Sequence, residues 1–494
     1  MTFQIKRSVL AVSVAAAIVA PLSAVATNGM LLEGYGPIAT GMGGASMAYD
    51  NGVAAVMNNP ATLGMMEDGE ARLDVALGNL APDITATHPL AGDADSAATS
   101  FFMPAVGYAV RNESLTYGVG MFAQGGMGTE YASASAVDPS MGGTGDVSRS
   151  EVGVGRLVAP IVYNVNKNLS VGGSIDYVFG GMDLMMAMPG DATGFGDFID
   201  TAVTVGGFNI SGAHNGGIAS GSLVDGLAGA MDAGGISGVN WVNFNFSDDS
   251  DYTGDAKGAG ITGKIGMTFK VNNNLTVGAT YHAKTAMSDL ETSNATVSMN
   301  VDGDGGFLTT GTPDGNPVIG QTVDLTGKLS VNDFQFPAQI GLGMAYQQDK
   351  WMVAADVKII QWADVMDSFR MTFTADAVPT NGMFGGASMD VEMYQNWEDQ
   401  TVIQIGGAYK VSSATTLRAG INSSSNPVPD ATMNHLFPAT IENHYTLGVG
   451  QAMGKTSSID FSLTIAPEVE VVAGSTVTTT HAQTNWQLMY SQKF

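Results

Sequence analysis

The sequence predicts an all-β fold, a fourteen-stranded antiparallel β-barrel that spans a membrane. Three observations lead to this prediction: apolar residues alternate with small or polar ones along many segments, short polar turns join these segments in pairs, and much longer connections separate the pairs. In a membrane barrel one face of each strand contacts lipid and the other lines a polar lumen. Because a water-soluble sandwich has the same alternation, the turn lengths decide between the two.

The first 26 residues have the features of a secretory signal peptide, in which Lys6 and Arg7 precede an apolar run and Ala24-Val25-Ala26 forms a cleavage site. This segment carries two basic residues and no acidic one, so its removal changes the formal net charge from −27 to −29. Such an acidic chain is a poor partner for nucleic acid. Beyond the signal, no uncharged apolar run approaches the roughly 20 residues of a spanning helix, which excludes a helical membrane protein.

The alternation has the period of a β-strand. From Leu169 to Phe179, the apolar residues Leu169, Val171, Ile175 and Tyr177 alternate with Ser, Gly or Asp. Short turns that indicate six hairpins lie at 110–115, 165–169, 271–275, 347–351, 411–417 and 451–459. Six hairpins give twelve strands, and single strands at 71–80 and 485–494 complete the fourteen.

The connections on the opposite side are long, as expected for the extracellular loops of a barrel. They lie at 81–99, 126–149, 181–259, 287–335, 364–399, 425–442 and 468–484, and the third and fourth are the longest. An alternating run at 323–331 is assigned to a hairpin within the fourth loop.

The last strand carries Trp486, Leu488, Tyr490 and the terminal Phe494 on one face, a pattern that barrel assembly machinery commonly recognises. Closing the sheet leaves no unpaired edge in the membrane. Closure also accounts for the stability of an exported chain without cysteine.

The segment "NGMLLEGYGPIATGMGGASMAYDNGVAAVMNNPATLGMM" resembles the start of the FadL family of outer-membrane transporters for long-chain fatty acids and other hydrophobic compounds. Asn59, Pro60 and Ala61 match the Asn-Pro-Ala motif of that family. The stretches "FPAQIGLGMAYQ" and "FPATIENHYTLGVGQ" look similar as well, so the resemblance covers essentially the mature chain.

The resemblance implies three parts: a signal peptide at 1–26, a hatch at 27–69 that blocks the lumen, and a barrel at 70–494. Pro60 biases Asn59 towards an extended conformation, which leaves the Asn59 amide free to fix the hatch to the wall. The protein is then expected to be a monomer in the bacterial outer membrane, in contact with membrane lipid and lipopolysaccharide, without a cofactor and not an enzyme.

The resemblance further implies passive transport of hydrophobic molecules, with long-chain fatty acids as the first expected substrate. Ligands would be captured in an extracellular apolar groove and leave sideways through the wall after the hatch moves. Aliphatic or aromatic hydrocarbons are the alternative substrate. A surface adhesin or structural barrel is a second alternative, and the six histidines lack the sequence context of a catalytic site.

Candidates for the groove lie in the loop at 181–259. Apolar residues recur there at helical spacing, and nearby methionines suit a pocket for varied apolar ligands. The candidates are Met185, Met186, Phe195, Phe198, Ile199, Leu223, Leu227 and Met231. The alternative is that the helical residues pack on one another and on the barrel rim, and that the methionines face lipid.

Two acidic clusters are candidates for calcium, because closely spaced carboxylates supply its oxygen ligands. They comprise Asp248, Asp249, Asp251 and Asp255, and then Asp302 and Asp304. The alternatives are solvated surface loops and loops bridged by divalent ions to lipopolysaccharide. Arg149, Arg156 and Lys257 are candidates, by position only, to meet a substrate carboxylate.

Overall fold

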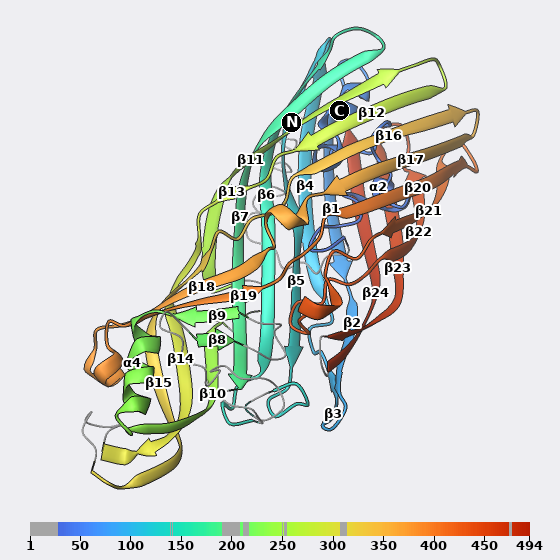
Figure 1. The fold of residues 1–494 in the computed structure, drawn as a ribbon. Helices are drawn as coiled ribbons and strands as arrows, with labels where there is room; N and C mark the ends of the chain where they lie inside the picture. The colour runs from blue at the N-terminus through green and yellow to red at the C-terminus, as the bar shows by residue number, and fades with distance from the viewer. Residues whose placement is uncertain are drawn as a thin grey trace, which may run out of the picture.

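The wall of the barrel is a continuous antiparallel sheet (Figure 1). The structure is a computed structural model that describes residues 28–138, 140, 142–189, 208–210, 217–248, 250, 254–306, 314–473 and 477–494. The predicted signal peptide therefore lies outside the described residues.

The strands that run the length of the wall are β1 (Ala71–Leu80), β4 (Phe101–Asn112), β5 (Leu115–Tyr131), β6 (Ser148–Asn164), β7 (Leu169–Pro189), β11 (Ala256–Lys270), β12 (Leu275–His282), β16 (Gln339–Gln348), β17 (Trp351–Ile360), β20 (Gln400–Lys410), β21 (Thr415–Ser424), β22 (Asn443–Ala452), β23 (Ser457–Ala473) and β24 (Val477–Lys493). β1 pairs with β24, and this pairing closes the wall.

Two further strands enter the wall at its outer end, β10 (Ile236–Phe246) and β14 (Leu290–Asp304). β7 and β11 pair directly only as far as Met182 and Ala256, and farther out β7 pairs with β10. β10 pairs in turn with β14, and Glu291 of β14 pairs with Lys257 of β11. Followed through these pairings, the closed circuit of the described residues contains sixteen strands.

The predicted number of fourteen strands is therefore wrong. The prediction counted strands by the short turns that join them, and β10 and β14 are separated in sequence by three other strands. No local turn marks their pairing, so both were assigned to long loops.

All six predicted hairpins are present, and β1 has the predicted bounds. Side chains alternate across the wall as expected: on β17, Val353 and Val357 face outward and are exposed, whereas Ala354 and Asp356 face the lumen and are buried. The last strand is longer than predicted, because β24 begins at Val477.

An outer layer continues the sheet beyond β14. Its elements are β15 (Pro317–Asn332), β18 (Ser368–Ala375), β19 (Ser388–Tyr394), β9 (Gly217–Ser220), β8 (Phe208–Ile210), α4 (Ser222–Asp232) and η3 (Pro379–Phe384). β14 and β15 form the hairpin predicted around 323–331. Smaller elements are β2 (Pro82–His88), β3 (Gly92–Asp95), β13 (Ala286–Met287), η2 (Trp362–Asp364) and η4 (Asp430–Thr432).

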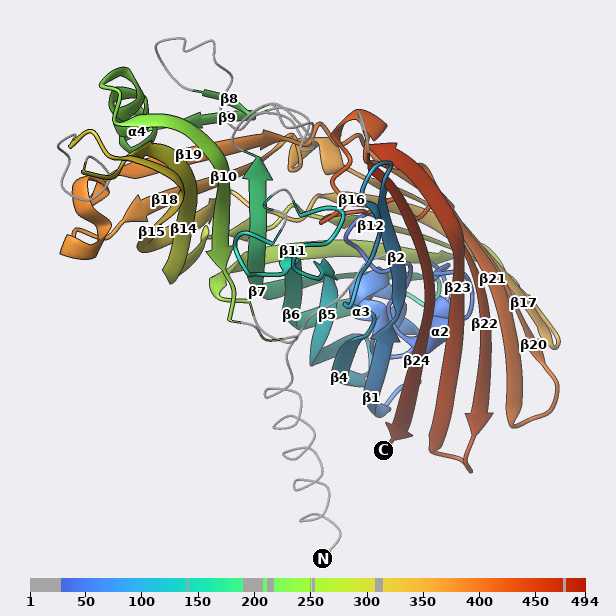
Figure 2. The ribbon, with the colours of Figure 1, turned by 90° about the horizontal axis from the view of Figure 1, so that it is seen from below.

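Residues 28–66, here called the inner segment, lie within the ring of strands (Figure 2). The inner segment contains α2 (Pro37–Thr40), α3 (Ala55–Asn58) and η1 (Pro60–Met65), and nearly all of its side chains are buried. Within the described residues, no helix has the length and apolar character needed to cross a membrane.

Candidate functional site

Asn59 joins two parts of the inner segment to the wall. Its Nδ2 donates to the carbonyl oxygen of Met47, at 2.8 Å, and to that of Met267 on β11, at 3.2 Å. Its Oδ1 accepts from the N–H of Ala61, at 3.1 Å, and so caps η1. Pro60 holds the first position of η1, and Asn59 is extended, as the residue before proline tends to be. The motif therefore ends a turn and links the segment to β11 with one side chain.

Lumen-facing side chains of the wall accept hydrogen bonds from the backbone of the inner segment. The Asp356 carboxylate accepts from the N–H groups of Ser46, at 2.5 Å, and Met47, at 3.0 Å. On the opposite side, Asp74 of β1 accepts from the N–H of Val53, at 2.6 Å. The wall thus satisfies backbone donors of the inner segment in addition to those bonded by its own side chains, such as Asn58 and Asp50.

A charged cluster fixes the inner segment at the end of the barrel that carries the short turns. Arg72 of β1 donates to both carboxylate oxygens of Asp50, at 2.7 and 2.8 Å, and to Glu70, at 2.8 Å. Burial alone would raise the pKa of Asp50, but the charge and hydrogen bonds of Arg72 and the N–H of Gly52 lower it below its usual value. Asp50 is therefore held as a carboxylate.

The wall is interrupted between β4 and β5. Their ladder ends at Val106 and Met121, although β4 continues outward to Phe101. β5 has a bulge between Ala123 and Gly125, and Gly125 pairs with Leu31 of the inner segment. At this gap, the inner segment occupies a place beside β5 that a neighbouring strand would otherwise fill.

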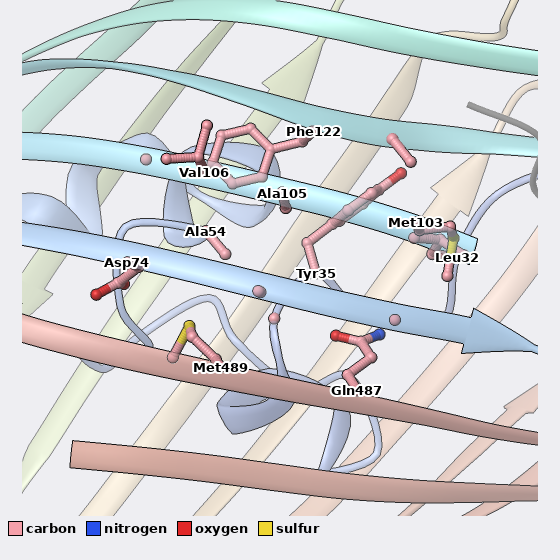
Figure 3. Close-up of a pocket in the computed structure, with 15 residues that line it drawn as sticks. Leu32, Tyr35, Ala54, Asp74, Met103, Ala105, Val106, Phe122, Gln487 and Met489 are labelled. Carbon is pink, nitrogen blue, oxygen red and sulfur yellow. The ribbon is translucent and has the colours of Figure 1, made fainter. Parts of the chain in front are cut away.

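A cavity of about 40 Å³ lies at this gap (Figure 3). Its lining is mostly apolar and comes from the inner segment and from β1, β4, β5 and β24. The Tyr35 hydroxyl donates to the carbonyl oxygen of Gln124, at 2.6 Å, and thereby ties the inner segment to the bulge. The Phe122 ring lies on the lumen side of the gap, against Gly107 and Gly120. A cavity that binds benzene measures about 150 Å³, so this one is too small for an aromatic ring.

A second, narrow cavity separates the inner segment from β12, β16 and β17, and Lys358 lines it. Lys358 is 8% exposed, and no hydrogen bond or ion pair joins its Nζ to another described residue. Beside it, His282 Nε2 lies 2.8 Å from the Asn58 carbonyl oxygen. The carboxylates of Asp356 and Glu33 interact electrostatically with the Lys358 ammonium group, so it is not an isolated charge.

The groove candidates within the described residues lie on α4 of the outer layer and on β7 of the wall, and all are buried or partly buried. Leu223, Leu227 and Met186 belong to one apolar core, Met231 packs against it, and Met185 is also buried. The packing of Leu223, Leu227 and Met231 corresponds to the alternative stated for the helical residues, whereas Met185 and Met186 are buried and do not face lipid. Phe195, Phe198 and Ile199 lie outside the described residues.

The acidic candidates accept hydrogen bonds from their own loops. Asp304 accepts from the backbone of residues 314 and 315, Asp302 from Gly320, Asp255 from Thr292 and Asp248 from Ser250. In the described ranges, no group of three or more metal-ligating side chains is placed to hold an ion. Asp249 and Asp251 lie outside those ranges.

The basic candidates are separated from one another. Arg156 is buried and donates to Asp176, at 3.0 Å, which also pairs with Lys264. Arg149 forms ion pairs with Glu130 and Glu151, both within 2.7 Å. Lys257 is exposed on β11.

Sequence reasoning missed Tyr35, Phe122 and Lys358. Lys358 was the easiest to find, because strand alternation places it on the lumen face of β17 with Asp356. Nothing in the sequence could have placed Tyr35 against β5.

The model of the family described as "Outer membrane protein transport protein (OMPP1/FadL/TodX)" matches residues 14–493. The crystal structure of the Pseudomonas putida toluene transporter TodX is similar, with 29% identity, a TM-score of 0.74 and coverage of 94% of this chain and 99% of TodX. The Ralstonia pickettii toluene transporter TbuX is similar at 28% identity and a TM-score of 0.71, with coverage of 94% and 99%.

A FadL homologue from Pseudomonas aeruginosa shares the fold at 16% identity and a TM-score of 0.60, with coverage of 94% of this chain and 99% of the homologue. An uncharacterised protein from Chlorobium limicola, named for the 5′ region of a phosphoenolpyruvate carboxykinase gene, is 55% identical over 62 residues. That match covers 13% of this chain and 30% of the Chlorobium protein's length.

The family model spans nearly the whole chain, and the similar structures are transport channels with the same barrel. The prediction of the family from the Asn-Pro-Ala segment is thus confirmed, and so are the expectations of an outer-membrane location and of a transporter rather than an enzyme. The chain belongs to the OMPP1/FadL/TodX family of outer membrane transport proteins.

Proposed function

We propose that this protein carries small apolar hydrocarbons, monoaromatic compounds first, across the outer membrane. The solved structures of toluene transporters are 28–29% identical to this chain, whereas the FadL homologue, at 16%, informs only the fold. Hydrocarbons therefore replace long-chain fatty acids as the first substrate. The observation that carries the proposal is the gap between β4 and β5, which the inner segment fills.

In this proposal the inner segment is a hatch and the gap is the exit. Exit of a hydrocarbon through a hydrated lumen would expose it to water, at a transfer free energy of about 0.8 kcal/mol for each methylene group. Exit through the gap leads directly into lipid and avoids that cost. The cavity of about 40 Å³ must grow several-fold before a ring can pass. Tyr35 and Phe122 are the side chains whose movement enlarges it.

Long-chain fatty acids are the second candidate, and Lys358 is the observation that favours them. Its ammonium group lines a cavity beside the inner segment, where a substrate carboxylate would accept a hydrogen bond from it. A hydrocarbon has no group that could do so. The two candidates therefore differ in their dependence on Lys358.

The test is uptake of labelled toluene and labelled oleate by cells that lack their own transporter and express this protein. Under the proposal, toluene enters faster than in cells without the protein, and an Asn59→Ala, Pro60→Ala variant changes that rate. Lys358→Met leaves toluene uptake unchanged and lowers oleate uptake, if oleate enters at all. Correct insertion of every variant is checked by the heat-dependent mobility of folded barrels in gels.

The exit is tested separately with Ala105→Trp, which places a large ring in the cavity at the gap. Uptake should fall about tenfold or more. Ala419→Trp, on the outward face of β21, is the matched control and should leave uptake unchanged. Equal uptake by the two inserted variants would rule out the gap as the exit, and no uptake of either label by the wild type would rule out the transport proposal.

A further inference from the structure

The six short turns, with the strand ends beside them, carry six basic residues and only two acidic ones, Glu113 and Asp349, although the chain as a whole has a formal net charge of −27. Each of the six short hairpins has a Lys or Arg in its turn or at the strand end beside it. They are Arg111, Lys167, Lys270, Lys350, Lys410 and Lys455. In outer-membrane barrels the short turns face the periplasm, so this ring of cations lies at the level of the inner leaflet.

Two of these cations lie together at one pocket. The N–H of Lys410 donates to the carbonyl oxygen of Lys350, at 2.9 Å, which brings the two turns side by side. A cavity of about 220 Å³ opens next to them, between the inner segment and the wall. This volume equals that of roughly seven liquid waters, which is enough for a small headgroup.

The charges around this cavity do not cancel. Arg418 also lines it, but Arg418 pairs with Asp460, at 2.8 Å. The carboxylate on its lining, Asp50, is paired with Arg72. The ammonium groups of Lys350 and Lys410 have no hydrogen bond or ion pair to any described residue, so the pocket carries two free positive charges.

Apart from Gln347 and Thr416, the rest of the lining is apolar or aromatic. Ile38 of the inner segment and Met352 of β17 form part of its apolar surface. Trp351, which is 61% exposed, packs against Tyr409 with ring centroids 4.3 Å apart. Such aromatic pairs are typical of membrane interfaces. The pocket thus combines cations with an apolar surface at the depth where lipid headgroups lie.

We propose that this pocket binds the phosphate headgroup of an anionic glycerophospholipid from the inner leaflet. Lys350 and Lys410 contact the phosphate at the rim, Met352 contacts the glycerol on the lumen side, and Trp351 contacts the first part of an acyl chain on the lipid side. Because Ile38 belongs to the inner segment, a bound lipid bridges the inner segment and the wall. The inference does not depend on which hydrocarbon or fatty acid crosses the barrel.

The test uses the full-length protein in nanodiscs of phosphatidylcholine that contain a minor fraction of phosphatidylglycerol. Lipids retained after transfer to neutral detergent are counted by native mass spectrometry. Wild-type protein should retain phosphatidylglycerol in preference to phosphatidylcholine. A Lys350→Gln, Lys410→Gln variant should lose that preference by roughly tenfold or more, given the usual contribution of each lysine near an anionic surface.

The matched control is Lys167→Gln, Lys455→Gln, which removes the same charge from the same rim at turns that do not line the pocket. It should retain the preference, and Lys350→Arg, Lys410→Arg should retain most of it. If both Gln variants lost the preference for phosphatidylglycerol equally, the preference would come from the overall charge of the rim, and the proposed site would be wrong. Loss of the preference in millimolar inorganic phosphate would show that the pocket binds free anions, and the lipid proposal would be wrong. Equal retention of both lipids by the wild type would also contradict the proposal.

Discussion

Single carboxylates set how firmly the inner segment is held, and the partly buried Asp50 is the one whose response to pH can be derived. Its pKa is lower in the folded protein than in the unfolded chain, because Arg72 and the N–H of Gly52 outweigh the effect of burial. Such a group stabilises the fold fully above its unfolded pKa of about 3.9. That stabilisation is lost as the pH falls through the lower, folded pKa.

We therefore expect ion conductance to rise when the pH falls below about 4, as the bond between Asp50 and Arg72 is lost. The measurement is single-channel current in planar bilayers between pH 7 and pH 3. Asp50→Asn should raise the conductance already at neutral pH and flatten its pH dependence. Asp349→Asn, on an exposed turn at the same rim, should behave like the wild type. Identical profiles for wild type and Asp50→Asn would contradict this role.

At the scale of single residues, the sequence predicted which residues matter better than it predicted which atoms they contact. Asn59 was found by its motif, and the reason its amide reaches β11 is local, because Pro60 extends the backbone before it. Alternation places Asp74 and Asp356 on the lumen face of their strands. Which N–H groups they bind depends on the path of the inner segment across the lumen, and no local pattern encodes that path.

Among the elements, β5 has the irregularity that most affects the position of the inner segment. Its bulge puts Gly125 against the inner segment, where a Cβ atom would lie 1.9 Å from the Met30 carbonyl oxygen. Gly125→Ala should therefore push the start of the inner segment away from β5, because overpacking of this kind costs about 1–3 kcal/mol.

The displacement is measured through a single introduced thiol, since the chain contains no cysteine. A Leu31→Cys reporter should react with a maleimide several-fold faster when Gly125→Ala is present. Gly238→Ala, on β10, is the matched control, because a Cβ atom there meets nothing within 4 Å. No acceleration would mean that the inner segment adapts to the added methyl group.

Short-range signals predicted the elements that they create. The turns at 165–169 and 347–351 join adjacent strands through a few polar residues, so the hairpins follow from local sequence. β10 pairs with β14 and β19 pairs with β9, across more than forty intervening residues in each case. Register over such distances is fixed by packing in the outer layer, which explains why the strand count was too low.

For the molecule as a whole, the barrel and the inner segment make separable contributions. The wall is closed by the pairing of β1 with β24, and this pairing does not involve the inner segment. Deletion of residues 28–66 should therefore leave a folded barrel with a water-filled lumen. We expect single-channel conductance to rise severalfold over the intact protein, with heat-dependent gel mobility retained. Conductance that stays at the level of the intact protein would show that another part of the chain blocks the lumen.

The close fit between wall and inner segment also restricts the order in which the protein is assembled. A Cβ atom at Gly43 would meet backbone atoms of Ile421 on β21, and one at Gly278 on β12 would meet the Met47 carbonyl oxygen. Such close approach of the two backbones, at strands four positions apart in the ring, leaves no clearance for threading the segment into a finished ring. The inner segment, which leaves the ribosome before any strand, is therefore already in position when β24 docks on β1 in the intact protein, and closure of the ring then locks it in place.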